Sequence, residues 1–271
     1  IISEGDKYNT DYGENGFVTK LKDIFRKDKL NPEMRGFVAF GMMEFDPNAT
    51  KYLISKKDAN FENYNIKDLG KLEYIVGNAY FRNSKVESLG NLKSISGGAY
   101  FEDSNIESLG NLKSIGREAY FDDSKVESLG NLESIGGTAR FSNSKIKSLG
   151  NLKSISGTAY FRNSNIKDLG NLESIGSDAR FMNSKVESLG NLKSIGGSAN
   201  FENSKVESLG KLESIGGGAN FYNSNIKDLG NLKSIVGDAF FEFSNVKSLG
   251  NLKSISGSAY FRNSNIKDLG N

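Results

Sequence analysis

Tyrosine and arginine recur at two positions of a pattern that returns every 20 residues. Both side chains combine a wide contact surface with hydrogen-bonding groups, and both are enriched among the residues that contribute most to binding at protein interfaces. Both positions vary between repeats, so the information that distinguishes a ligand is expected there. The candidate ligand-binding residues are Tyr80, Tyr100, Tyr120, Arg140, Tyr160, Arg162, Arg180, Met182, Tyr222, Phe240, Tyr260 and Arg262.

Arginine is concentrated in the middle of this series. The middle patch comprises Arg140, Tyr160, Arg162, Arg180 and Met182. Guanidinium groups bind carboxylate, phosphate and sulfate through paired hydrogen bonds, so the patch is a candidate anion site. The alternative is that two neighbouring acidic residues, Asp178 and Glu202, neutralise it.

Aromatic residues gather nearer the C-terminus. This second patch comprises Tyr222, Phe240, Phe243 and Tyr260. Phe243 replaces the Asn that other repeats have at its position. Exposed aromatic rings this close together indicate contact with a partner such as a peptide or a sugar ring. A locally repacked unit is the competing explanation.

The composition restricts the chemistry that the chain can perform. Histidine and cysteine both number 0, which removes the usual general base, the commonest metal ligand and thiolate chemistry. No nucleophile, phosphate-loop or metal-ligand motif is present, so neither a cofactor nor catalysis is expected. Glu102 and Asp122 are predicted neighbours on one face, and this carboxylate pair gives one remote alternative, a polysaccharide-active or carbohydrate-binding solenoid.

Charge and hydropathy bear on two further classes of partner. Lys and Arg number 35 against 33 Asp and Glu, a net charge of +2, so no global field attracts nucleic acid. No apolar run reaches the roughly 18 residues of a membrane span. The sequence does not determine the cellular compartment, although a secreted or cell-surface location is favoured.

The repeats begin near residue 51 and continue to residue 271. The unit from Lys71 reads KLEYIVGNAYFRNSKVESLG. Six apolar positions per unit are too few for a core within one unit, but stacked units align them into continuous columns. In this unit they are Leu72, Ile75, Ala79, Phe81, Val86 and Leu89. The period predicts a mainly β solenoid of about eleven turns over residues 51–271.

The apolar spacing changes within each unit. Around Ala79–Arg82 it has period two, which predicts a short strand with Tyr80 facing outward. The stretch Leu69–Ile75 has a spacing of three, too short between glycines for a regular helix, and predicts a turn-rich return path. The recurring Asn83–Ser84 pair is expected to form a polar ladder that satisfies backbone groups of the next turn.

Residues 1–50 do not repeat. Apolar residues over 17–25 fall at helical spacing behind Asn15, a suitable N-cap, and the densely apolar stretch 36–45 fits either helix or strand. We expect a small α/β cap, because the open end of a solenoid exposes its core and its strand edge. The sequence predicts no matching cap at the other end, where the polypeptide either continues or meets a second molecule end to end.

The repeat resembles the leucine-rich-repeat family, whose motif has the spacing L-x-L-x-x-N-x-L-x-x-L. Ala79, Phe81, Ser84, Val86 and Leu89 fit that spacing, with Ser in place of the usual Asn and with Ala and Phe in place of two leucines. The units are also similar to the repeats of receptor L domains. Both resemblances imply a right-handed solenoid used for recognition, and the first implies that the strand face is the concave, ligand-holding side.

These observations predict a non-catalytic recognition module that binds a protein or peptide through the variable strand face, with carbohydrate as another partner. One competing interpretation is that Tyr and Arg are ordinary cross-strand neighbours in a sheet. Another is a structural role as a spacer, an adhesin stalk or a filament subunit that assembles end to end.

Overall fold

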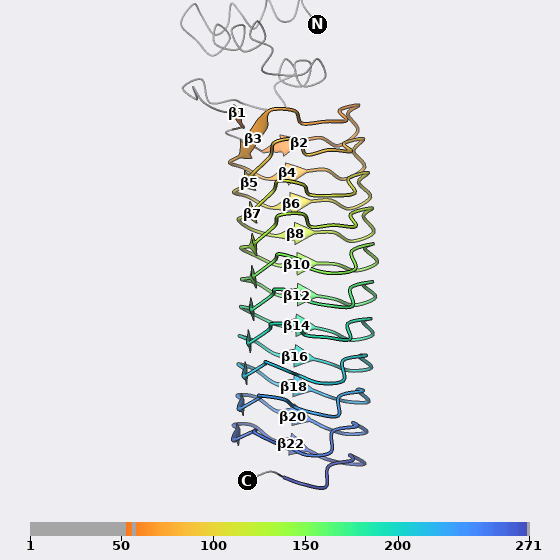
Figure 1. Cartoon of the computed structure of the whole chain (residues 1–271), viewed down its shortest axis with the longest axis vertical. Helices are drawn as coiled ribbons and strands as arrows, with labels where there is room; N and C mark the ends of the chain where they lie inside the picture. Colours follow the sequence, from red (N-terminus) through yellow and green to blue (C-terminus); the bar gives the residue numbers. More distant parts are fainter. Residues whose placement is uncertain (1–52, 56–57, 270–271) are drawn as a thin grey trace, which may run out of the picture.

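The computed structural model of the chain describes residues 53–55 and 58–269. Every regular element in these ranges is a β-strand, and successive 20-residue turns are stacked along one axis (Figure 1). The predicted mainly β solenoid is confirmed. The α/β cap predicted over 1–50 lies outside the described residues. In the ranges that are described, no helix is long and apolar enough to cross a membrane.

Each turn contributes one strand to each of two parallel sheets of eleven described strands. The first, here called the serine sheet, consists of β1 (Leu53–Ser55), β3 (Leu72–Ile75), β5 (Ser94–Ile95), β7 (Ser114–Ile115), β9 (Ser134–Ile135), β11 (Ser154–Ile155), β13 (Ser174–Ile175), β15 (Ser194–Ile195), β17 (Ser214–Ile215), β19 (Ser234–Ile235) and β21 (Ser254–Ile255). The second, the alanine sheet, consists of β2 (Ala59–Asn60), β4 (Ala79–Tyr80), β6 (Ala99–Tyr100), β8 (Ala119–Tyr120), β10 (Ala139–Arg140), β12 (Ala159–Tyr160), β14 (Ala179–Arg180), β16 (Ala199–Asn200), β18 (Ala219–Asn220), β20 (Ala239–Phe240) and β22 (Ala259–Tyr260). Ala159 pairs with Ala179, and Ser154 with Ser174, so the register equals the sequence period.

The serine sheet corrects one sequence-based expectation. The stretch predicted to be a turn-rich return path contains a second strand in every turn, such as Ser94–Ile95. Hydrogen bonds join it to its neighbours, because Gly116 N–H donates to the carbonyl of Ile95 at 2.8 Å. The apolar residues around this strand, such as Leu92 and Ile95, are three positions apart and show no alternation, so the sequence did not reveal it. A third side of the turn carries isolated bridges, as between Asp68 and Ser88.

The core is a set of columns that run the length of the described solenoid. The predicted phenylalanine column is confirmed, since rings from Phe61 to Phe261 stack with centroids 4.9–5.6 Å apart. Phe61 through Phe241 are fully buried, and the adjoining alanines are buried with them. Because each ring covers the next, the column stabilises neighbouring turns rather than any single turn.

Two corners of each turn need a left-handed backbone. Glycine occupies the first, as at Gly90 with φ 55°, where a Cβ would lie 2.4 Å from the carbonyl oxygen of Gly70. Asn or Asp occupies the second, as at Asn83 with φ 51°, because their short polar side chains tolerate this conformation. These corners fix which residues of the repeat face outward.

The prediction that the Asn–Ser pair forms a polar ladder is wrong for the serine. Ser84 and its equivalents are 0–3% exposed, and their Oγ atoms have no hydrogen-bond partner among the described residues. Polar contacts between turns come from the serine's two neighbours in the chain, as where Asn223 Nδ2 donates to Asn203 Oδ1 at 2.7 Å and Asn165 Nδ2 donates to the carbonyl of Ser144 at 2.8 Å. The serines concerned are Ser84, Ser104, Ser124, Ser144, Ser164, Ser184, Ser204, Ser224 and Ser244.

Candidate recognition face

Two columns of variable side chains lie along the outward side of the alanine sheet. The strand column is formed by the second residue of each strand, and the turn column by the residue two positions later. The sequence placed both columns on the strand. The strands end after two residues, so the turn column lies beside the sheet. The strand column contains Tyr80, Tyr100, Tyr120, Arg140, Tyr160, Arg180, Phe240 and Tyr260, and the turn column contains Arg162, Met182, Tyr222 and Arg262.

The first part of the strand column is a self-contained aromatic ladder. The rings of Tyr80 and Tyr100 stack with centroids 5.0 Å apart, and Tyr100 meets Tyr120 edge to face at 5.3 Å. The Arg140 guanidinium lies 5.2 Å from the centre of the Tyr120 ring. Burial raises the pKa of the Tyr100 phenol above its ordinary value, so the phenol stays neutral at physiological pH. The three tyrosines and Arg140 therefore form one continuous series of contacts along the column.

The middle patch is partly neutralised. Arg140 Nε lies 2.7 Å from Asp122 Oδ2, and Arg180 Nη2 lies 2.8 Å from Asp178 Oδ2. Compensation by Asp178 was the alternative read from the sequence, and Asp122 was missed as a partner. Arg162 is exposed and forms no ion pair within the described part of the chain.

Tyr160 is the exposed aromatic residue of this patch. Its ring is 37% exposed, and it lies in register with Arg140 before it and Arg180 after it. Both arginines are engaged by carboxylates, and in the described ranges no second ring stacks on Tyr160. Its phenol and one ring surface are therefore available to a partner. Met182 is half-buried in the turn column of the next turn.

The aromatic patch resolves into two pairs. Phe240 stacks on Tyr260 with centroids 4.9 Å apart and ring planes within 2° of parallel. Tyr222 meets Phe243 edge to face at 5.5 Å, and these two rings are 41% and 47% exposed. Phe243 has φ 55°, a left-handed conformation that costs a bulky residue roughly 1–2 kcal/mol. The repeat tolerates this strain at a position that Asn otherwise fills.

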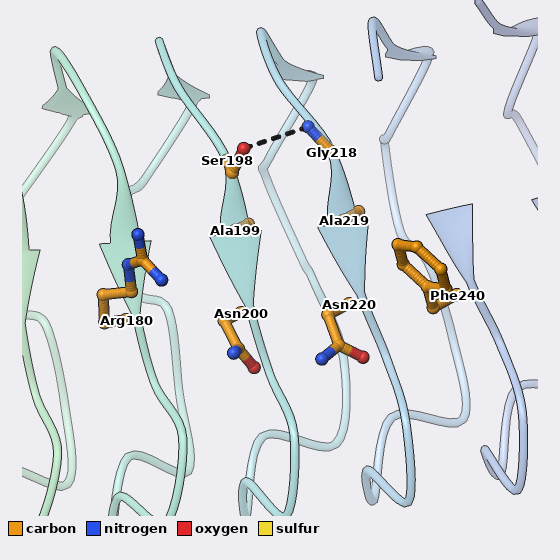
Figure 2. A pocket seen from close by; sticks show the side chains of 8 residues that line it. All are labelled: Arg180, Ser198, Ala199, Asn200, Gly218, Ala219, Asn220 and Phe240. Atoms are coloured by element: carbon orange, nitrogen blue, oxygen red, sulfur yellow. Dashed lines mark hydrogen bonds between the residues drawn. The ribbon is translucent and has the colours of Figure 1, made fainter. Parts of the chain in front are cut away.

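A shallow depression of about 180 Å³ interrupts the strand column. Figure 2 shows Arg180 and Phe240 on either side of Asn200 and Asn220. The two amides fold back on their own turns, because Asn200 Oδ1 accepts from Glu202 N–H and Asn220 Oδ1 from Tyr222 N–H, each at 2.9 Å. The depression exists because these side chains are short and held close to the backbone.

Two small residues widen the same depression. Above the asparagines the lining residues are Ser198 and Gly218, and Ser198 Oγ accepts from the Gly218 N–H at 3.1 Å (Figure 2). The hydroxyl proton of Ser198 is consequently free to donate. The polar groups in the depression that can form further hydrogen bonds are therefore mainly donors. They are this hydroxyl, the asparagine Nδ2 groups and the Arg180 guanidinium.

The carboxylate pair behind the polysaccharide alternative is engaged in ion pairs. Glu102 Oε1 lies 2.8 Å from Arg82 Nη2, and Asp122 binds Arg140. The ion pair raises the pKa of the Arg82 guanidinium. Among the described residues, no group of three or more acidic side chains is arranged to hold a metal ion.

Comparison of the chain with protein-family models, with curated proteins and with solved structures finds no match. Its function is therefore inferred from the chemistry of its own surfaces, and of these the alanine sheet carries the variable residues.

Proposed function

We propose that this chain is a recognition module that binds a protein or peptide partner through the outward side of the alanine sheet. The observation that carries the proposal is the contrast between constant and variable columns. Every column needed for the core or for a corner is nearly constant, whereas the strand and turn columns vary and expose Tyr160 and Tyr222. Variation that the fold does not require is expected where a partner is recognised.

The residue types support a protein or peptide partner. Tyrosine, phenylalanine and arginine supply most of the binding energy at protein interfaces when they lie together near the centre of a contact. The strained Phe243 supports the same inference, because backbone strain persists where exposing a particular side chain has a use. Eleven strands at about 4.8 Å make a face of roughly 50 Å, long enough for an extended peptide.

Peptide selection followed by two matched variants tests this proposal. A phage-displayed random peptide library is panned on the wild-type chain, and the affinities of the enriched peptides are measured by biolayer interferometry. We expect Tyr160→Ala or Tyr222→Ala to weaken binding about tenfold, equivalent to about 1.4 kcal/mol. The control is Lys193→Ala on the serine sheet, which we expect to bind as the wild type does. Enrichment of no peptide, or equal binding by all three variants, contradicts the proposal.

A structural spacer or stalk is the second candidate. The regular stacking of the phenylalanine column supports a rigid rod, because each ring contacts both neighbours through the described turns. Small-angle X-ray scattering across a concentration series separates the two candidates. A single particle length at all concentrations supports recognition, and growth of the particle in multiples of its length supports end-to-end assembly.

A further inference from the structure

The strand column holds two aromatic ladders, and only one of them ends on a neighbouring cation. In the first, Tyr80, Tyr100 and Tyr120 contact one another, and the Arg140 guanidinium covers the last ring at 5.2 Å. Cations favour the face of an aromatic ring because its π system is electron-rich. The first ladder therefore ends on a cation.

The second ladder has the same components with a gap between them. Phe240 and Tyr260 form its rings, and Arg180 is the nearest arginine of the same column. Tyr260 covers one face of Phe240. The opposite face points to the preceding turn, which presents Asn220, followed by Asn200 (Figure 2). Arg180 and Phe240 are three strand spacings apart, about 14 Å, too far for a direct contact.

The size of the gap fits a side chain. The depression between Arg180 and Phe240 has a volume of about 180 Å³, whereas sites for small molecules usually measure roughly 300–1,000 Å³. One wall is the uncovered face of Phe240, and the other is the Arg180 guanidinium. A flat ring inserted next to Phe240 would stack on it as Tyr260 does, and its other face would be turned toward the Arg180 side of the depression.

The surrounding charges select the kind of ring. Asp178 already binds Arg180 at 2.8 Å, and the Glu202 carboxylate lies within 3.5 Å of Asn220 Nδ2. These carboxylates disfavour an anionic occupant. A tyrosine is complementary to the site, because its ring can stack on Phe240, its hydroxyl can donate to a carboxylate, and its oxygen can accept from an asparagine Nδ2.

We propose that the depression between Arg180 and Phe240 receives an aromatic side chain, preferably tyrosine, from the partner, which stacks on Phe240 and extends the second ladder toward Arg180. This inference rests on the proposed recognition function and names the group that anchors the partner. The partner is expected to present this side chain from an extended segment that lies across the alanine sheet.

Model compounds test the inference without the partner. The probes are N-acetyl-L-tyrosinamide, N-acetyl-L-leucinamide and methyl β-glucopyranoside, each titrated into the ¹⁵N-labelled chain. We expect tyrosinamide to shift the Asn200 and Asn220 side-chain amide signals upfield through its ring current, and leucinamide to leave them unchanged. Equal shifts with leucinamide, or shifts with the glucoside alone, overturn the inference.

A matched pair of variants locates the binding. Asn220→Tyr fills the gap from within the chain and is expected to weaken tyrosinamide binding at least tenfold. Asn60→Tyr is the control, because Asn60 lies in the same column and also accepts from the N–H two residues on, at 2.8 Å, but lies away from the depression. Should Asn220→Tyr fail to fold, Phe240→Ala tests the same wall and is expected to remove the ring-current shifts.

The two proposals fail in different ways. If tyrosinamide leaves the asparagine signals unchanged while selected peptides still depend on Tyr160 and Tyr222, the anchor is wrong and the recognition face stands. If selected peptides bind independently of the alanine sheet, the recognition function is wrong. An Asn60→Tyr variant that loses tyrosinamide binding as Asn220→Tyr does also overturns the anchor.

Discussion

The serine and alanine sheets share one backbone register and one core, yet their outward sides differ. On the serine sheet the outward residue is Ser at every turn from Ser94 to Ser254. Beside it lies a column of Lys and Glu in which neighbouring turns form ion pairs, as between Lys153 and Glu133 at 2.7 Å and between Lys193 and Glu173 at 2.8 Å. On the alanine sheet the equivalent columns hold Tyr, Arg, Asn, Phe, Met and acidic residues.

The difference shows which residues the solenoid itself requires. Because the serine sheet repeats one outward residue from Ser94 to Ser254, the fold is satisfied over these turns by a constant column of small polar side chains. The variety on the alanine sheet is then not a condition of folding. The predictions that follow test this division between constant scaffold and variable surface.

The largest difference in the free energy of unfolding is expected between a constant and a variable residue that are adjacent in the chain. Phe161→Ala removes one fully buried ring from the column and should lower the free energy of unfolding by about 3–5 kcal/mol. Tyr160→Ala removes a ring that is 37% exposed and should change it by about 0.5 kcal/mol at most. Urea denaturation measures both. Similar losses in the two variants would abolish the distinction between core and surface columns.

Exchanging the residues at one left-handed corner tests whether Phe243 is a departure from the scaffold. Asn223→Phe, at the same corner one turn earlier, should destabilise the chain by about 1–2 kcal/mol because of its positive φ of 48°. Phe243→Asn should stabilise it by about 0.5 kcal/mol, since relief of strain exceeds the lost edge-to-face contact with Tyr222. A clear loss of stability in Phe243→Asn would make Phe243 part of the scaffold.

The buried serine column tests whether a constant residue always stabilises through its polar group. Ser144→Ala removes a hydroxyl without a hydrogen-bond partner among the described residues and should raise the free energy of unfolding by about 1 kcal/mol. In the control, Ser148→Ala, the lost Oγ accepts from the Gly150 N–H at 3.2 Å, so stability should fall by about 0.5–1 kcal/mol. Destabilisation by Ser144→Ala would show that the hydroxyl itself is required.

The smallest effect is expected from the charged column beside the serine sheet. The hydrogen bond from Lys193 lowers the pKa of Glu173, so the stabilisation is complete above the ordinary glutamate pKa of about 4.3 and is lost as the pH falls through the lower folded value. Lys193→Gln should therefore be slightly less stable than the wild type at neutral pH and equal to it in acid. Lys113→Gln, whose amine has no ion pair in the described ranges, is the control.

Thermal denaturation as a function of pH checks this expectation, and peptide affinity provides a second readout. Neither lysine variant should change the affinity of a peptide that depends on Tyr160. A loss of affinity in Lys193→Gln alone would assign recognition to the serine sheet and would reverse the comparison.

Much of the fold follows from the sequence because its features repeat. The columns from Leu72 to Leu89 and the outward position of Tyr80 were predictable, since a 20-residue period averages out local ambiguity. The serine sheet was not predictable, because the apolar residues around strands such as Ser94–Ile95 have a spacing of three, without the alternation that Ala79 and Phe81 show. The role of Asn83 was missed for another reason, since a ladder-forming Asn and a left-handed Asn have the same spacing.

The candidate site was predictable only as a list of exposed side chains. The ion pairs and ring contacts that each side chain forms decide whether it can bind a partner. These contacts depend on distances between turns. The ion pair of Arg140 with Asp122 and the stacking of Phe240 on Tyr260 both needed coordinates. The depression was invisible for the same reason, since Asn200 and Asn220 look unremarkable until their neighbours Arg180 and Phe240 are in place.

Site-specific photo-crosslinking tests the central claim most directly. The crosslinker p-benzoylphenylalanine is placed at Ser142 in the turn column of the alanine sheet or at Lys153 beside the serine sheet, and each chain is irradiated with a selected peptide. Recognition through the alanine sheet predicts covalent capture of the peptide from position 142 and background levels from position 153. Capture from position 153 alone, or equally from both positions, would contradict it.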